Sequence, residues 1–278
     1  MTCPTCAQHH TCTNRNKKVV LDTSLLIRVV SFLCRQYETH SRVSPVVASF
    51  GDLCSGLEYF LGRVTDCAID GAIHVSARVL SNEMDPGSGT STMRTQVPYP
   101  PALVNSHPQR CHSQLRGTLM SAVVATPVDD DFLRALRAAQ PGANDLSDED
   151  VSLIALAILE CDATAQVAVI SLDENLVRWG RKVRSRKQLE HAGREYVTAR
   201  IYPEDGLVFL SAVHECCQLD TGPYEELVEF AETQDIERVL TLNPQTVQRK
   251  WRRAKKLKRE LRQAERRKYR ASSSPATV

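Results

Sequence analysis

Short apolar runs alternate along this chain with longer stretches of helical periodicity. Runs typical of buried strands lie at 17–21, 72–75, 121–126 and 166–171, and a last strand is expected at 195–202. Helices are expected at 25–32, 45–64, from Ser76 to beyond Glu83, at 131–139 and at 147–159. Strands that alternate with helices at this spacing predict an α/β domain with a mostly parallel sheet.

The same pattern divides the chain into four parts. A Cys/His-rich segment, 1–16, precedes the α/β domain, which we place at 17–203. Between Met84 and roughly Gly117 the composition shifts to Pro, Gly, Ser and Thr, so a mobile insertion is expected at about 85–117. After Pro203 the pattern is helical, with a helical extension at 204–245, then a basic helical arm and a disordered end at 246–278.

Composition indicates an ordinary globular protein. The chain has 278 residues, 42% hydrophobic and 24% charged, enough for one or two domains of ~150 residues. It has no apolar run of the ~18 residues that a membrane span needs. No apolar signal segment follows Met1, and with ten Cys we expect free thiols in a reducing compartment, hence an intracellular, cytoplasmic protein.

The net charge of +2 hides a strong asymmetry. Residues 249–270 hold thirteen of the 35 Lys and Arg and two of the 33 Asp and Glu, so residues 1–248 keep 22 basic and 31 acidic residues, a net of −9. A block of like charge next to an acidic body usually marks an interaction segment, often for nucleic acid. Residues expected to contact RNA phosphates are Arg249, Lys250, Arg252, Arg253, Lys255, Lys256, Lys258 and Arg259.

Two other interpretations of the arm stay open. A narrow apolar stripe runs down it at helical spacing, made of Trp251, Ala254, Leu257, Leu261 and Ala264. Such a stripe could dock on a protein partner or on the acidic body of this chain. The arm could also be a solvated helix.

The N-terminal segment contains half of a possible zinc site. Cys3 and Cys6 have the C-x-x-C spacing, and His9, His10 and Cys12 follow. A four-ligand site usually needs a second pair, and a single C-x-x-C is a weak signal. A Zn²⁺ site at Cys3 and Cys6 is therefore one hypothesis, and a disordered N-terminus is the other.

Acidic residues follow two of the predicted strands. Asp22 and Asp173 come just after apolar runs, and in a parallel sheet the carboxyl ends of the strands meet at one edge. Asp148 and Asp150 lie in the first turn of the Ser147 helix, and Glu83 lies two turns into its helix. Carboxylates brought together repel one another unless a divalent cation neutralises them, and all-oxygen ligation selects Mg²⁺ or Mn²⁺.

Each acid also has a purely structural interpretation. Ser147 and Asp150 match the S-x-x-[DE] capping pattern. Asp22 and Asp173 could each open a turn after a strand, and Glu83 could be a solvated helix residue. The order of all four along the chain carries more weight than any one of them.

That order resembles the four acidic motifs of PIN-domain nucleases. The motifs are Lys18–Ser24, His74–Glu83, Leu146–Ala157 and Ala168–Asp173, within a region of roughly 17–202. The resemblance implies a parallel sheet flanked by helices and Mg²⁺- or Mn²⁺-dependent hydrolysis of phosphodiesters, usually in RNA. By position it implies a catalytic metal site of Asp22, Glu83, Asp150 and Asp173, with Asp148 auxiliary and Ser24 and Ser171 in support.

The residues themselves agree with metal-dependent hydrolysis. A bound divalent ion neutralises charge on a phosphate and makes a water nucleophilic. The chain has no GxxxxGK[ST] loop, which disfavours an ATPase. The sequence therefore predicts a Mg²⁺- or Mn²⁺-dependent ribonuclease. The competing hypothesis is a non-catalytic RNA- or protein-binding module on the same fold.

Overall fold

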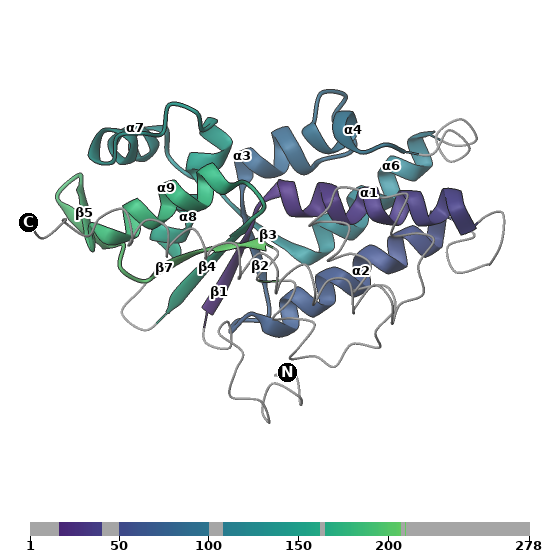
Figure 1. The fold of residues 1–278 in the computed structure, drawn as a ribbon, viewed down its shortest axis with the longest axis horizontal. Coiled ribbons are helices and arrows are strands. Elements are labelled where there is room, and N and C mark those ends of the chain that lie inside the picture. Colours follow the sequence, from purple (N-terminus) through teal and green to yellow (C-terminus); the bar gives the residue numbers. More distant parts are fainter. Residues whose placement is uncertain (1–16, 41–49, 100–107, 162–164, 207–208, 210–278) are drawn as a thin grey trace, which may run out of the picture. The chain divides into compact units, whose positions relative to one another are not determined.

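The computed structural model describes residues 17–40, 50–99, 108–161, 165–206 and 209, all within one compact unit of the chain. They form a five-stranded parallel sheet with helices on both faces, which confirms the predicted α/β class (Figure 1). The strands are β1 (Lys17–Leu21), β2 (Ile73–Ser76), β3 (Val123–Thr126), β4 (Gln166–Ser171) and β7 (Ile201–Asp205).

The strand order is β3-β2-β1-β4-β7, so β1 lies at the centre. Val19 pairs with Ile73 of β2 on one side and with Ala168 of β4 on the other. The chain first adds β2 and β3 on one side of β1 and then returns to add β4 and β7 on the other. The order therefore reverses between β1 and β4, where open α/β sheets place their ligands.

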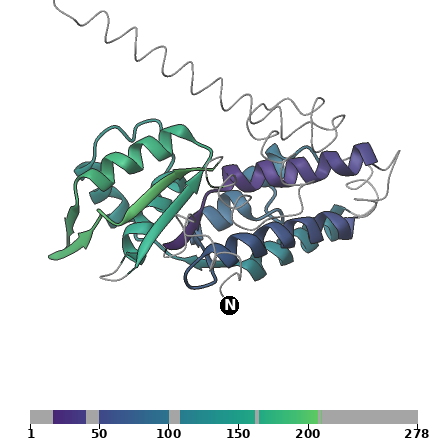
Figure 2. The same ribbon diagram turned by 60° about the horizontal axis from the view of Figure 1, so that its bottom comes forward.

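The helices lie in two layers. On one side are α1 (Thr23–His40), α2 (Phe50–Cys67) and α6 (Pro108–Ala122), which pack on one another and on the sheet. On the other, α8 (Asp148–Glu160) and α9 (Glu174–Ser185) cover the sheet, and α7 (Asp130–Ala139) packs on α8 (Figures 1 and 2). Every residue of α8 from 151 to 158 is buried, as its apolar sequence predicts.

The region around the predicted last strand differs from expectation. Instead of one strand at 195–202, the chain forms an antiparallel hairpin of β5 (Gln188–His191) and β6 (Arg194–Val197), and then β7. The hairpin reverses at Ala192 and Gly193, with φ angles of 51° and 72°. Two successive positive φ angles are typical of the tight turns of hairpins. Alanine seldom takes such an angle, so the turn was not evident in the sequence.

The Pro-rich segment after Met84 contains regular structure. Ser91 caps α4 (Thr92–Gln96) by accepting a hydrogen bond of 3.2 Å from the Arg94 amide. Helix α6 begins at Pro108 and continues to Ala122, so β3 starts only at Val123. Proline suits the first turn of a helix, where its missing N–H is no loss. Helical structure therefore replaces much of the expected irregular insertion.

Several predictions lie outside the described residues. These are the Cys3 and Cys6 pair, the basic arm, and the helical extension except for residues 204–206 and 209; of the latter, Glu204 and Asp205 belong to β7. Within the described part of the chain, Cys34, Cys54 and Cys67 are buried, whereas Cys161 is partly exposed. In the same part, no helix has both the length and the apolar character needed to cross a membrane.

Candidate carboxylate site

Asp22 occupies the centre of the candidate site. It follows β1, its backbone N–H donates to the Ile170 carbonyl at 3.0 Å, and it is only 3% exposed. Its Oδ2 accepts hydrogen bonds from the hydroxyls of Ser24 and Ser171. Burial raises the pKa of Asp22, and the two hydroxyls counteract part of that rise.

The two serines connect the ends of β1 and β4. Ser171 Oγ accepts from the Asp173 amide at 2.8 Å while it donates to Asp22 at 2.5 Å. Ser24 Oγ accepts from the Leu172 amide at 3.0 Å. Each hydroxyl thus links the Asp22 carboxylate to a backbone amide of the loop after β4. Ser24 and Ser171, the two residues expected in support, therefore both contact Asp22.

Asp150 both caps α8 and belongs to the acidic cluster. Its Oδ2 accepts from the Ser147 amide and hydroxyl, each at 2.9 Å, and its own amide donates to Ser147 Oγ at 3.0 Å. This reciprocal capping box confirms the structural interpretation of the motif. It does not isolate the carboxylate: burial raises the pKa of Asp150, and the nearby charge of Asp173 raises it further.

Glu83 reaches the cluster from an unusual helix. Ser76 caps α3 (Ala77–Val79), which continues as a π-helical turn, η2 (Leu80–Met84). Single π-helical turns are frequent at functional sites because they redirect a side chain. Burial raises the pKa of Glu83 from 4.5 to about 7, with further contributions from Asp22 and Asp150. Glu83 is therefore not a fully solvated helix residue, which was its purely structural interpretation.

Electrostatic coupling joins all four acids into one cluster. The charge of Asp150 raises the pKa of Asp22, those of Asp22 and Asp150 raise that of Glu83, and that of Asp173 raises that of Asp150. Asp173 also caps α9, because its Oδ1 accepts from the Asn175 amide at 2.7 Å. The four carboxylates therefore lie near enough to influence one another electrostatically, around the ends of β1 and β4 where the strand order reverses.

The donor set fits a hard divalent cation, although the side chains do not form a ready-made cage. All four donors are carboxylates, the ligand type that Mg²⁺ and Mn²⁺ prefer. In the part of the chain that the structure describes, no three Asp, Glu, His or Cys side chains are arranged so that they could hold one metal ion. Binding by this set would thus require the side chains to move closer together.

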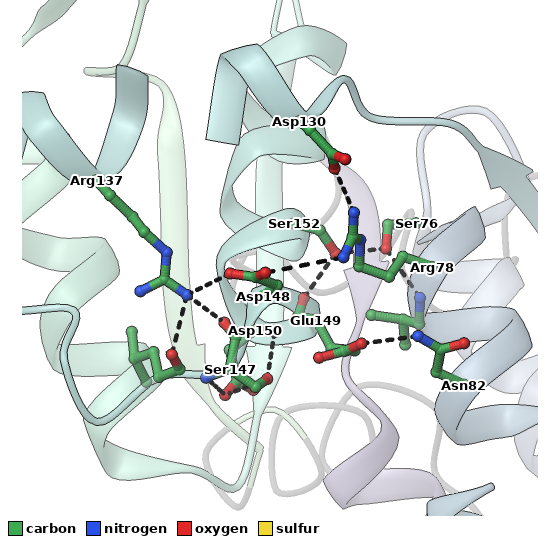
Figure 3. Close-up of polar contacts among 12 residues, drawn as sticks. Ser76, Arg78, Asn82, Asp130, Arg137, Ser147, Asp148, Glu149, Asp150 and Ser152 are labelled. Carbon is green, nitrogen blue, oxygen red and sulfur yellow. Dashed lines mark hydrogen bonds and ion pairs between the residues drawn. The ribbon is translucent and has the colours of Figure 1, made fainter. Parts of the chain in front are cut away.

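Asp148 lies apart from this cluster. Its carboxylate is 58% exposed, accepts from Arg137 at 2.8 Å and lies 3.9 Å from Arg78 (Figure 3). Arg137 also donates to the carbonyls of Ala143 at 2.8 Å and of Leu146 at 3.0 Å. These contacts fix the loop that precedes α8. Asp148 therefore helps to position the start of α8, and the structure does not bring it to the other four acids.

Three residues near the site were not singled out from the sequence. Glu149 adds to the pKa rise of Glu83, and its Oε1 accepts from Asn82 at 2.8 Å (Figure 3). The Thr23 side chain lowers the pKa of Glu83. The Oγ1 atom of Thr23 is buried and makes no hydrogen bond of standard geometry within the described residues. Arg78 also pairs with Asp130. The acidic run 148–150 was a signal for Glu149. The other two depend on contacts distant in sequence.

Searches against models of known protein families, curated proteins and solved structures found no match to this chain.

Proposed function

We propose that this protein is a PIN-like ribonuclease that hydrolyses RNA phosphodiester bonds with Mg²⁺ or Mn²⁺. The observation that carries the proposal is that Asp22 is held between the ends of β1 and β4 and that Glu83, Asp150 and Asp173 are electrostatically coupled to it or to one another near the reversal of strand order. These acids come from four separate parts of the sequence. Structural roles alone would explain two of them as caps but would not explain why all four meet.

The energetic state of the cluster favours cation binding. Burial and like charge raise the pKa of three of the acids, which means that the ionised cluster is unfavourable without a counterion. A bound divalent cation would remove that penalty, and all-carboxylate ligation matches Mg²⁺ or Mn²⁺. Such an ion stabilises the negative charge that develops on a phosphate and activates a water.

The chain's own residues would position this ion. Ser24 and Ser171 hold Oδ2 of Asp22 at the strand ends, and the capping box holds Oδ2 of Asp150. Both carboxylates are oriented by such bonds, and the other acids would have to move toward them to share one ion. Oriented ligands of this kind are typical of catalytic metal sites.

RNA as the substrate rests on two sequence features. One is the resemblance of the four motifs to PIN-domain nucleases. The other is the basic arm at 249–270, with thirteen Lys and Arg, which lies outside the described residues. The competing proposal is an RNA- or protein-binding module that keeps the fold without catalysis.

A cleavage assay separates these proposals. The full chain is incubated with single-stranded, hairpin and structured RNAs in Mg²⁺, in Mn²⁺ or in EDTA. We expect cleavage only with metal, and a loss of at least about 100-fold in Asp22→Asn and Asp173→Asn, because removing a charged ligand costs several kcal/mol of transition-state stabilisation. Asp66→Asn, on the exposed side of α2, is the control.

Two outcomes would contradict the nuclease. If folded wild type binds RNA but cleaves none of the substrates, the binding module is the better description. If the two site variants cleave as fast as wild type, the activity belongs to other residues or to a contaminant, and the carboxylate site is wrong.

A further inference from the structure

Helix α9 presents a row of cations on its solvent side. Arg178, Arg181 and Lys182 are all exposed, and we call these three residues the α9 cationic face. From residue 174 to 187 the chain has six Lys or Arg and one Glu. This basic segment is separate from the arm at 249–270, where the predicted RNA contacts lie.

Helical geometry gathers these cations on one side. Positions 178, 181 and 182 are spaced i, i+3 and i+4, which brings them onto one face of a helix. The opposite side is buried and includes Trp179 and Val183, and α9 packs there on β4 and β7. Trp179 further anchors the helix by donating to the Gln140 carbonyl at 3.1 Å. The three cations are therefore held on a fixed, outward-facing surface.

Helix stability does not explain this face. Like charges at i, i+3 and i, i+4 destabilise a helix by a few tenths of a kcal/mol per pair. The helix dipole favours cations only in the last turn, which accounts for Lys182 but not for Arg178 or Arg181. Arg178 pairs with Glu174 at 2.9 Å, but their side chains are 61% and 84% exposed, so this pair contributes little. A ligand that neutralises the face is the more economical explanation.

The position of the face relates it to the carboxylate site. Asp173, a member of the acidic cluster, is the N-cap of α9, so the helix leads away from that site toward the β5 hairpin (Figure 1). At 1.5 Å per residue, Lys182 lies about 14 Å along the axis from Asp173. This separation is one that a few nucleotides of a strand with a phosphate at the cluster could span.

We propose that the α9 cationic face binds the phosphate backbone of the RNA strand that enters the carboxylate site. The inference rests on the proposed function. Charge complementarity supports it, because residues 1–248 carry a net charge of −9 and would otherwise repel RNA. Contacts of this type add affinity without reading the sequence, and each one makes binding more sensitive to salt.

The test is a salt titration of RNA affinity with the full chain, with Asp22→Asn in every protein to prevent cleavage. The variant pair is Arg181→Gln/Lys182→Gln. The matched control is Arg63→Gln/Arg116→Gln, which removes the same charge from α2 and α6. The salt slope is the slope of log affinity against log salt concentration. Loss of two phosphate contacts should reduce its magnitude by about 1.4 and lower the affinity by about tenfold near 0.15 M salt. The control should change neither quantity by a comparable amount.

A charge-conserving variant checks that the fold is intact. Arg181→Lys/Lys182→Arg should retain the wild-type slope, and thermal melts of the α9 variants should agree with wild type within a few degrees because both positions are exposed. Equal salt slopes with and without Arg181→Gln/Lys182→Gln would overturn the inference. That result would be expected if α9 contacts a protein and not RNA. An equal loss in the control pair would also overturn it, because the effect would then be one of net charge.

Cleavage separates this inference from the proposed function. If wild type cleaves RNA while the α9 variants bind normally, the inference fails and the nuclease stands. If wild type does not cleave but the α9 variants lose affinity and slope, the RNA surface stands and the nuclease fails. If wild type does not bind RNA at all, both fail.

Discussion

The hydroxyl of Ser171 donates a hydrogen bond of 2.5 Å to Oδ2 of Asp22, from the end of β4 to the residue that follows β1. The two strands are in register just before this point, where Leu21 pairs with Ile170. A buried carboxylate is thereby fixed where the strand order reverses. Its charge is costly there unless a cation compensates it.

Asp22→Asn should stabilise the metal-free protein. Burial and the nearby Asp150 raise the pKa of Asp22, so removal of the charge relieves both penalties. The expected gain is of order 1 kcal/mol, or about 2–4 °C in Tm for a unit of this size. Thermal melts in EDTA measure it, with Asp66→Asn as control. Mg²⁺ should then raise the Tm of wild type but not that of the variant. A lower Tm for Asp22→Asn would mean that the hydrogen bonds from Ser24 and Ser171 outweigh burial.

Stability of the metal-free protein should fall as pH rises from about 4.5 to about 7. The pKa of Glu83 is raised by burial from 4.5 to about 7, so the folded state holds a proton that the unfolded state has lost in this window. The contribution is complete below pH 4.5 and lost above pH 7. Because Glu83 is partly exposed, we expect of order 1 kcal/mol. Melts of wild type and Glu83→Gln across this range in EDTA should show the smaller decline in the variant. Parallel curves would exclude a raised pKa at Glu83.

Substitution of Arg137 should destabilise the protein far more than substitution of Arg134, although both residues lie on α7. Arg137 donates to carbonyls before α8 and to Asp148 at 2.8 Å. Among the described residues, Arg134 forms its ion pair with Asp131, and their side chains are 72% and 68% exposed. Arg137→Gln should cost about 1–3 kcal/mol and slow cleavage, because the start of α8 positions Asp150. Arg134→Gln should stay within about 0.5 kcal/mol. Urea denaturation of both variants decides the matter, and similar midpoints would show that these contacts do not hold the loop.

Gly180 should not tolerate a methyl group. A Cβ there would lie 2.7 Å from Pro203 Cγ and 2.8 Å from Ile154 Cδ1, between α9 and its neighbours β7 and α8. Gly180→Ala should destabilise by about 1–3 kcal/mol through overpacking. Gly117, within α6, has nothing within 4 Å of such an atom. Gly117→Ala should therefore stabilise by about 0.5–1 kcal/mol. Opposite shifts in denaturation midpoint are expected, and a neutral Gly180→Ala would show that α9 packs more loosely than described.

Local signals explain what the sequence could predict. The run Gln166–Ser171 was expected as a strand with these bounds, because both faces of a central parallel strand are apolar. Ser147 and Asp150 were expected to cap a helix, since a capping box depends only on residues three apart. The acids after β1 and β4 follow from the rule that strand ends of a parallel sheet meet at one edge.

Features that depend on contacts between residues distant in sequence could not be predicted from local sequence patterns. The π-helical turn that carries Glu83 has no sequence pattern of its own, and Arg137 meets Asp148 only after α7 folds onto α8. Asp148 was a candidate auxiliary ligand because it lies only two residues from Asp150. On a helix such neighbours face different directions. In the structure Asp148 accordingly turns toward two arginines.

Deletion of residues 246–278 should weaken RNA binding far more than it slows cleavage of saturating substrate. The arm holds thirteen Lys and Arg, while residues 1–248 are acidic by nine charges. On one helix only some of these cations can reach phosphates together, and with ~5 or 6 contacts the salt slope on single strands is roughly −4. Full-length and truncated proteins, both with Asp22→Asn, are compared by salt titration. Equal affinities and slopes would show that the arm serves a protein partner or packs on the acidic body. If the α9 cationic face supplies the remaining contacts, the truncated protein should have a salt slope that is smaller in magnitude than that of the full-length protein but still clearly different from zero.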